Sequence, residues 1–176
     1  MIEHKDLGIY ENINWDEFYM GLAFYVAMKS EDTSTKVGAV FVNDYNRVLS
    51  LGLNGIPSGV SPEEDMFERP DKYLYFEHAE RNAVYNAQLP LVNSRVYVNM
   101  FPCAECARAI IQVRSKEIIY HEEFNAFQKD GHEWDKSHKA ALRMFDKRGL
   151  KVTPYSGAIP SHIYGWKAGH KFDLTK

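Results

Sequence analysis

The chain has 176 residues, of which 45% are hydrophobic and 26% charged, and its formal net charge is −3. This length is typical of one domain with a substantial core. The acidic balance, without a Lys/Arg cluster, argues against binding to a polynucleotide, because phosphate neutralisation supplies much of that affinity. The polar first residues and the absence of a long apolar run argue against a signal peptide and a membrane span. We therefore expect a cytoplasmic protein that binds no membrane.

The first third of the chain predicts a helix followed by a β-hairpin. Asn14 is a suitable N-cap for a helix that runs to about Ser30. Residues 37–42 and 47–53 predict two strands, joined by a turn at 43–46. We expect the helix to bury an apolar stripe that consists of Trp15, Phe18, Tyr19, Leu22, Tyr25 and Val26.

The rest of the chain predicts helices that alternate with strands, which favours parallel neighbours in a three-layer α/β sandwich. Gly149 is a fitting helix stop. We expect one domain over residues 1–155 and a C-terminal extension, 156–176, that packs on the domain or on a neighbouring subunit. The predicted helices cover residues 78–88, 103–114 and 134–147, and the predicted strands 95–99, 117–121 and 150–155.

Two short motifs contain three potential metal ligands and one carboxylate. His78 and Glu80 flank Ala79, and Cys103 and Cys106 lie three residues apart. If a helix starts at Cys103, both thiols lie near one edge of its first turn, where the helix dipole favours thiolates. One imidazole and two thiolates suit Zn2+ and leave its fourth position for water. We therefore predict His78, Cys103 and Cys106 as zinc ligands.

The chemistry that such a site supports is hydrolysis at an aromatic carbon that carries an amino group. Zinc lowers the pKa of a bound water from 15.7 toward about 7. A carboxylate beside that water can take its proton and pass protons to the ring nitrogen and to the leaving ammonia. Glu80 is placed for this role, and we predict it as the catalytic residue.

The Cys-x-x-Cys motif also occurs in redox pairs and in structural zinc sites. A redox pair would not explain the preceding Pro102 or the His-Ala-Glu motif, and a structural disulfide is disfavoured without a secretory signal. A structural site with two cysteines and two histidines would need a second histidine from His121, His132 or His138. This alternative stays open.

Four blocks of the chain resemble the deoxycytidylate deaminases of the cytidine deaminase superfamily. They are residues 35–40, 52–59, 78–83 and 101–107, and the similarity extends over roughly residues 15–155. The pattern H-x-E…P-C-x-x-C is typical of zinc-dependent deaminases of cytosine and adenine. The resemblance implies a cytidine deaminase-like three-layer α/β/α sandwich. Its five-stranded mixed sheet begins with an antiparallel hairpin, and its reaction is hydrolysis of dCMP to dUMP and ammonia.

The resemblance also implies substrate contacts. Asn54 matches an asparagine that contacts the sugar, and the Ala79 backbone N–H would hold the pyrimidine O2. Phe101 and Phe124 are candidates to stack on the base. For Asn54 a simple turn role stays open, as does a core role for both phenylalanines.

Residues 61–77 form a long, charge-rich connection before the zinc-ligand helix, which is unusual in a compact domain. One interpretation is a lid, or a phosphate clamp supplied by Arg69 or Lys72; the other is a solvated surface loop. The resemblance identifies no phosphate ligand, so Lys36, Arg69, Lys72 and Arg81 are all candidates.

The family resemblance further implies a homo-oligomer and possible dCTP and dTTP effectors near residues 55–59. Three hypotheses for function follow. The first is a dCMP deaminase. The second is a deaminase of another cytosine substrate, such as cytidine, deoxycytidine, dCTP or 5-substituted dCMP, a base in tRNA being disfavoured by the acidic charge. The third is a non-enzymatic interaction module stabilised by zinc, in which Glu80 would have no role.

Overall fold

A computed structural model describes residues 13–125, 134–160, 164–167 and 170–173. None of the helices in these ranges is long and apolar enough to cross a membrane. The predicted cytoplasmic location stays a prediction. The elements in chain order are α1 (Trp15–Ala27), β1 (Gly38–Val42), β2 (Val48–Leu53), η2 (Glu64–Phe67), α2 (Lys72–Tyr75), α3 (Ala79–Tyr85), β3 (Arg95–Val98), α4 (Ala104–Gln112), β4 (Glu117–His121), α5 (Glu122–Asn125), α6 (Asp135–Arg148), β5 (Lys151–Tyr155), β6 (Tyr164–Lys167) and β7 (His170–Asp173).

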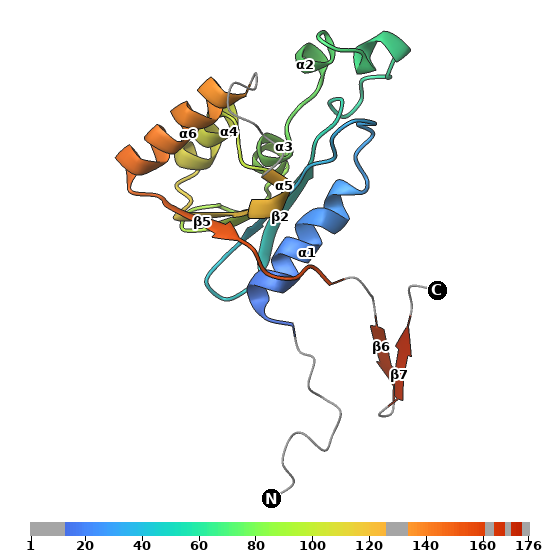
Figure 1. Ribbon diagram of the computed structural model, residues 1–176, viewed down its shortest axis with the longest axis vertical. Coiled ribbons are helices and arrows are strands. Elements are labelled where there is room, and N and C mark those ends of the chain that lie inside the picture. The colour runs from blue at the N-terminus through green and yellow to red at the C-terminus, as the bar shows by residue number, and fades with distance from the viewer. Residues whose placement is uncertain (1–12, 126–133, 161–163, 168–169, 174–176) are drawn as a thin grey trace, which may run out of the picture.

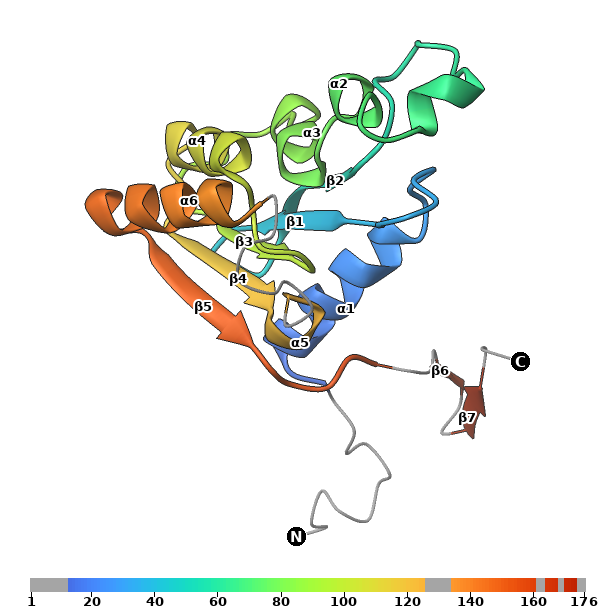
Figure 2. The same ribbon diagram turned by 45° about the horizontal axis from the view of Figure 1, so that its top comes forward.

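The five-stranded mixed sheet has the order β2-β1-β3-β4-β5. Strand β1 pairs antiparallel with both β2 and β3, whereas β3, β4 and β5 are parallel. Figures 1 and 2 show α3, α4 and α6 on one face of the sheet, and α1 and α5 on the other. The three-layer α/β/α sandwich that the sequence predicts is confirmed, including its initial antiparallel hairpin.

The sheet separates two hydrophobic clusters. Ala39 and Phe41 of β1 point into the cluster under α3, α4 and α6. Val40 and Val42 point into the opposite cluster, under α1. All five residues of β1 are buried, as expected for a strand that is covered on both faces.

Helix α1 starts where the sequence predicts. The Oδ1 atom of Asn14 accepts a hydrogen bond from the Glu17 backbone N–H at 2.9 Å, which caps the helix. The helix ends at Ala27, three residues before the expected end at Ser30, which lies outside it.

The prediction that the aromatic stripe of α1 is entirely in the core is wrong. Tyr19 is fully buried, but Trp15, Phe18 and Tyr25 are 54%, 41% and 60% exposed. The helix instead buries Tyr19, Met20, Ala23 and Ala27, and Ala23 lies against Gly38 of β1. A Cβ atom at Gly38 would lie 2.1 Å from the Ala23 carbonyl oxygen. Gly38 therefore permits α1 to approach β1 closely.

Other element ends differ slightly from expectation. Helices α3 and α4 end at Tyr85 and Gln112, a few residues early. Gly149 stops α6 as predicted, with a left-handed φ of 69°. The long connection 61–77 is ordered, because it contains η2 and α2.

The C-terminal extension begins by crossing α1. Ile159 packs against the cluster under α1, and Pro160 contacts Gly21 of that helix. Strands β6 and β7 then form an antiparallel hairpin that the sequence analysis missed. The hairpin lies apart from the five-stranded sheet in both Figure 1 and Figure 2. Its packing on a neighbouring subunit stays a prediction.

Candidate active site

Two helix starts bring the predicted zinc ligands together. His78 and Cys103 are the N-cap residues of α3 and α4, and both have extended backbone angles. Cys106 is buried in the first turn of α4. The His78 Nδ1 atom lies 3.5 Å from the Sγ atoms of both cysteines. All three potential ligand atoms lie within 4.8 Å of one another, close enough to hold one metal ion.

Strand β2 determines where α3 begins. A Cβ atom at Gly52 would lie 2.1 Å from the Ala79 carbonyl oxygen and 2.4 Å from the Ala83 nitrogen, so only glycine permits this approach. Two backbone hydrogen bonds of 3.0 and 2.8 Å join Gly55 to Glu77, the residue before His78. Residues 52–55, at the end of β2 and just after it, therefore hold the start of α3 in place.

The donor set fits zinc. The Cys106 and His78 side chains hydrogen bond to the Cys103 sulfur and lower the pKa of this thiol to about 3. A thiolate, a second cysteine and an imidazole are typical zinc ligands, and three protein ligands leave one coordination position open. The His121 and His138 side chains are not part of this group, and His132 lies outside the described residues. Among the described residues, nothing supports the structural site with two histidines.

Glu80 lies beside the ligand group and is only 3% exposed. Burial raises the pKa of its carboxyl group above the ordinary value, although the His78 imidazole opposes this shift. A shift in this direction moves the pKa of the carboxyl group toward neutral pH, which favours general acid–base catalysis. Glu80, the predicted catalytic residue, therefore lies next to the predicted metal ligands.

A cavity of about 260 Å³ opens onto this group, and His78, Glu80 and Cys103 form part of its lining. Both predicted stacking residues line it as well. Phe101 also belongs to the core, with its ring centroid 5.0 Å from that of Tyr120. The core role and the stacking role that the sequence left open for Phe101 are thus compatible. The aromatic rings in the cavity wall are Tyr73, Phe76, Phe101, Phe124 and Trp134.

Sequence analysis missed several residues of this wall. The ring centroid of Trp134 lies 5.9 Å from that of His78 and 5.4 Å from that of Tyr73. His138 lines the cavity too, 5.5 Å from the Phe101 ring. Trp134 and His138 lie four residues apart at the start of α6, so they share one face. The spacing alone could have indicated a shared helix face, but no motif would have placed that face beside the zinc ligands in residues 78–106.

Asn54 and Ala79 line the cavity, as expected for residues that contact substrate. Asn54 is buried, and Ala79 is the first residue of α3. The N–H group at this position of a helix has no partner within the helix. It is therefore a suitable donor to a carbonyl oxygen in the cavity.

The four cationic candidates for the phosphate ligand lie in different places. Arg69 and Lys72 line the cavity, so the long connection contributes to the site. Contrary to expectation, Lys36 lines a second hollow, and its ammonium group donates to the Ser30 carbonyl oxygen. Arg81 is outside the cavity lining, because its guanidinium group pairs with the carboxylates of Glu77 and Glu105.

Comparisons with known proteins agree with this geometry. The family model described as "Cytidine and deoxycytidylate deaminase zinc-binding region" matches residues 13–122. The chain is 36% identical to mouse deoxycytidylate deaminase over 152 residues, which cover 81% of this chain and 82% of the relative. It is 39% identical to the human deoxycytidylate deaminase over 115 residues, 61% of this chain and 65% of the relative.

Among solved structures, the dCMP deaminase of cyanophage S-TIM5, in complex with dCMP and dUMP, superposes with a TM-score of 0.62. It is 25% identical, and the match covers 79% of this chain and 95% of the phage chain. The matched family region contains the whole group of His78, Cys103 and Cys106. The chain therefore belongs to the family of zinc-binding cytidine and deoxycytidylate deaminases.

Proposed function

We propose that this protein hydrolyses dCMP to dUMP and ammonia. The observation that carries the proposal is the buried Glu80 carboxyl group beside the His78, Cys103 and Cys106 ligands, in a cavity with an aromatic wall. The human and mouse relatives named deoxycytidylate deaminase, and the phage enzyme bound to dCMP and dUMP, support this choice of substrate.

The residues of the cavity have complementary roles in this reaction. Zinc, when bound by the three ligands, supplies the Lewis acidity that makes water nucleophilic near neutral pH. Glu80 takes a proton from the attacking water and gives it to the ring nitrogen, and it then transfers the remaining proton of the added hydroxyl group to the departing amino group. The Ala79 N–H donates to the pyrimidine carbonyl oxygen, while Phe101 and Phe124 hold the ring by stacking.

We propose Arg69 as the phosphate ligand, because it lines the cavity and carries a guanidinium group, which suits a phosphate. Among the described residues of the cavity lining, Arg69 and Lys72 carry the permanent positive charges. The Lys72 ammonium group is buried against the Asp32 carboxylate, so its charge is already neutralised. A guanidinium group also binds phosphate with two parallel hydrogen bonds.

A panel of substrates tests the proposal. We expect zinc-loaded protein to release ammonia from dCMP faster than from CMP, deoxycytidine, dCTP or 5-methyl-dCMP. Faster turnover of another member would replace the substrate but keep the class of reaction. No turnover of any member by protein with one zinc per chain would favour the interaction module.

The substitution Glu80→Gln tests the role of the carboxyl group. We expect it to lower kcat by at least about 100-fold, because general acid–base catalysis contributes 10²–10⁴-fold. Zinc content and melting temperature should stay at the wild-type values. The control is Glu122→Gln, which changes an exposed glutamate. Full activity of Glu80→Gln would refute the mechanism.

We also propose that the protein is a homo-oligomer. The exposed rings of Trp15, Phe18 and Tyr25 lie on one helix, together with Met28 at its end, and support an interface there. Light scattering should give a multiple of the 20.3 kDa chain mass, and Tyr25→Glu should lower it. A monomeric wild type would contradict the proposal. Regulation by dCTP or dTTP stays a prediction, which addition of either nucleotide to the dCMP assay tests.

A further inference from the structure

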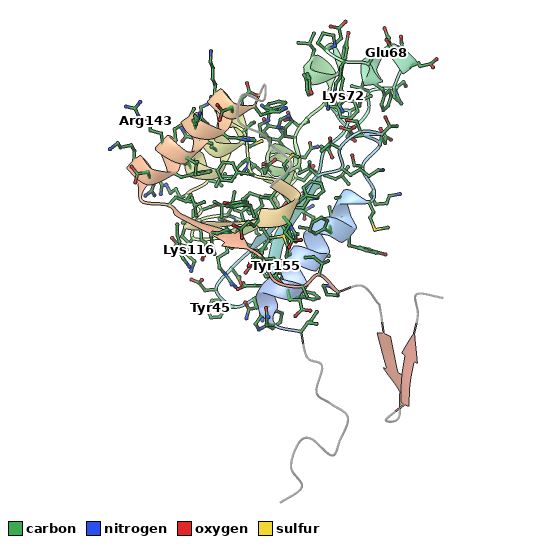
Figure 3. The ribbon with its side chains drawn as sticks, viewed as in Figure 1. Tyr45, Glu68, Lys72, Lys116, Arg143 and Tyr155 are labelled. Carbon is green, nitrogen blue, oxygen red and sulfur yellow. The ribbon has the colours of Figure 1, made fainter. Side chains whose placement is uncertain are left out.

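A buried ion pair lies in the cavity wall beside Asn54. The Lys72 Nζ atom is 2.6 Å from Asp32 Oδ2 and 2.7 Å from Oδ1. The two side chains are only 6% and 4% exposed. Lys72 belongs to α2, in the long connection, where Figure 3 labels it together with Glu68. Buried charges are costly unless their hydrogen bonds are satisfied, so this pair needs an explanation.

Asp32 is fully engaged as a hydrogen-bond acceptor. Besides Lys72, its carboxylate accepts from the backbone N–H groups of Ser34 and Thr35, at 2.8 and 3.1 Å, and from Asn54 Nδ2 at 3.0 Å. Burial opposes the charged form, but these hydrogen bonds and the Lys72 charge lower the pKa of Asp32 below its ordinary value. Asp32 therefore only accepts hydrogen bonds at neutral pH.

This network determines how the Asn54 amide is oriented. The Nδ2 group donates to Asp32 and, at 2.8 Å, to the Thr35 carbonyl oxygen. The Oδ1 atom accepts from the Val37 backbone N–H at 2.7 Å. A carboxylate and a carbonyl can only accept, and an N–H can only donate, so a flipped amide would lose all three bonds. Within the described part of the chain, one lone pair of Oδ1 remains for a ligand.

We propose that Asp32 and Lys72 are positioning residues that hold the Asn54 amide as an acceptor, and thereby select a nucleotide with a free hydroxyl group on its sugar. The inference rests on the proposed function: the deoxyribose of dCMP carries one hydroxyl group, at the 3′ position. A nucleotide esterified there has no proton to donate. The same pair would thus disfavour nucleotides within a polynucleotide.

Lys72 also connects this network to the cavity wall. Its Nζ atom donates to Ser34 Oγ at 3.2 Å, and the Arg69 guanidinium donates to the same oxygen at 3.3 Å. Arg69 and Tyr73 come from the same connection and line the cavity. One ion pair therefore ties this part of the cavity wall to Asn54.

The first test compares dCMP with 2′,3′-dideoxycytidine 5′-monophosphate, which lacks the hydroxyl group. We expect the wild type to prefer dCMP by about 10-fold in kcat/KM, the effect of one hydrogen bond of about 1.4 kcal/mol. Asp32→Asn should reduce this preference to about 2-fold or less, because an amide at position 32 can donate as well as accept. The control is Lys116→Met, which breaks a pair with Asp44; Lys116 lies far from Lys72 in Figure 3. It should keep the 10-fold preference.

A double variant distinguishes positioning from stability. Asp32→Asn alone leaves the Lys72 charge buried and unpaired, so we expect it to lower the melting temperature. Asp32→Asn combined with Lys72→Met removes both charges and should restore most of that loss. The preference of this double variant for dCMP over the dideoxy nucleotide should stay at about 2-fold or less. If the preference returns with the melting temperature, the pair has only a structural role and the proposal is wrong.

A measurement without substrate separates this inference from the proposed function. In zinc-loaded protein, Asn54 protects the Val37 amide hydrogen from exchange with solvent. By nuclear magnetic resonance, we expect Asp32→Asn combined with Lys72→Met, which keeps most of the wild-type melting temperature, to exchange this hydrogen at least about 10-fold faster than Lys116→Met. Faster exchange in a protein inactive on dCMP would support positioning and reject the proposed function. Unchanged exchange would overturn the positioning role, whatever the activity.

Discussion

Replacing Gly52 by alanine should displace the catalytic helix. The new Cβ atom would lie 2.1 Å from the Ala79 carbonyl oxygen, whereas real Cβ contacts are rarely below 3.0 Å. The atoms in the way belong to the backbone of α3, so no side chain can rotate aside. The start of α3 must therefore move by about 0.9 Å relative to β2. His78 and Glu80 must move with it, because they flank Ala79.

Two quantities follow from that displacement. A misplacement of about 1 Å at a reacting group costs about 100-fold in rate, so we expect kcat/KM for dCMP to fall by about that factor. Overpacking costs about 1–3 kcal/mol, which in a chain of this size lowers the melting temperature by about 2–12 °C. Steady-state kinetics, zinc analysis and calorimetry measure these effects.

Two other glycines provide the controls for this experiment. A Cβ atom at Gly55 would meet the Leu53 side chain at an ordinary 3.8 Å, so Gly55→Ala should resemble the wild type. In Gly38→Ala, the new Cβ atom would lie equally close, at 2.1 Å, to the Ala23 carbonyl oxygen, but on the opposite face of the sheet. It should lower the melting temperature with a much smaller effect on the rate. If Gly52→Ala keeps kcat/KM within about 3-fold of Gly55→Ala, the reasoning about α3 is refuted.

Two further predictions concern the metal and the pH dependence of stability. His78→Ala should lower the zinc content well below one per chain, because it removes one of three ligands; an unchanged content would remove His78 from the ligand set. The pKa of Asp32 is lowered by folding, so its contribution to stability is present above the unfolded pKa and is lost as the pH falls through the folded one. In urea unfolding, the wild type should therefore lose more stability than Asp32→Asn below about pH 4. Parallel curves would contradict this.

The sequence alone determined the features that depend on neighbouring residues. The cap at Asn14, the stop at Gly149 and the helix start at Cys103 are local, because a helix end is set by the few residues around it. Hydrophobic periodicity is also a local property of the sequence, so the order of strands and helices, and with it the fold class, could be predicted. The metal site could be predicted from the short motifs around residues 78, 103 and 106, because each ligand lies at or near a helix start, which is itself set by local sequence.

The tertiary structure alone decided which side chains meet across the fold. Lys36 and Lys72 are both plausible phosphate ligands by charge, yet one contacts the Ser30 carbonyl oxygen and the other is buried against Asp32, 40 residues away. Trp134 reaches His78 only because α6 begins over the cavity. The close approach of α1 to the sheet likewise depends on Gly38 in another element. Such contacts are set by packing between distant segments, which local periodicity does not encode.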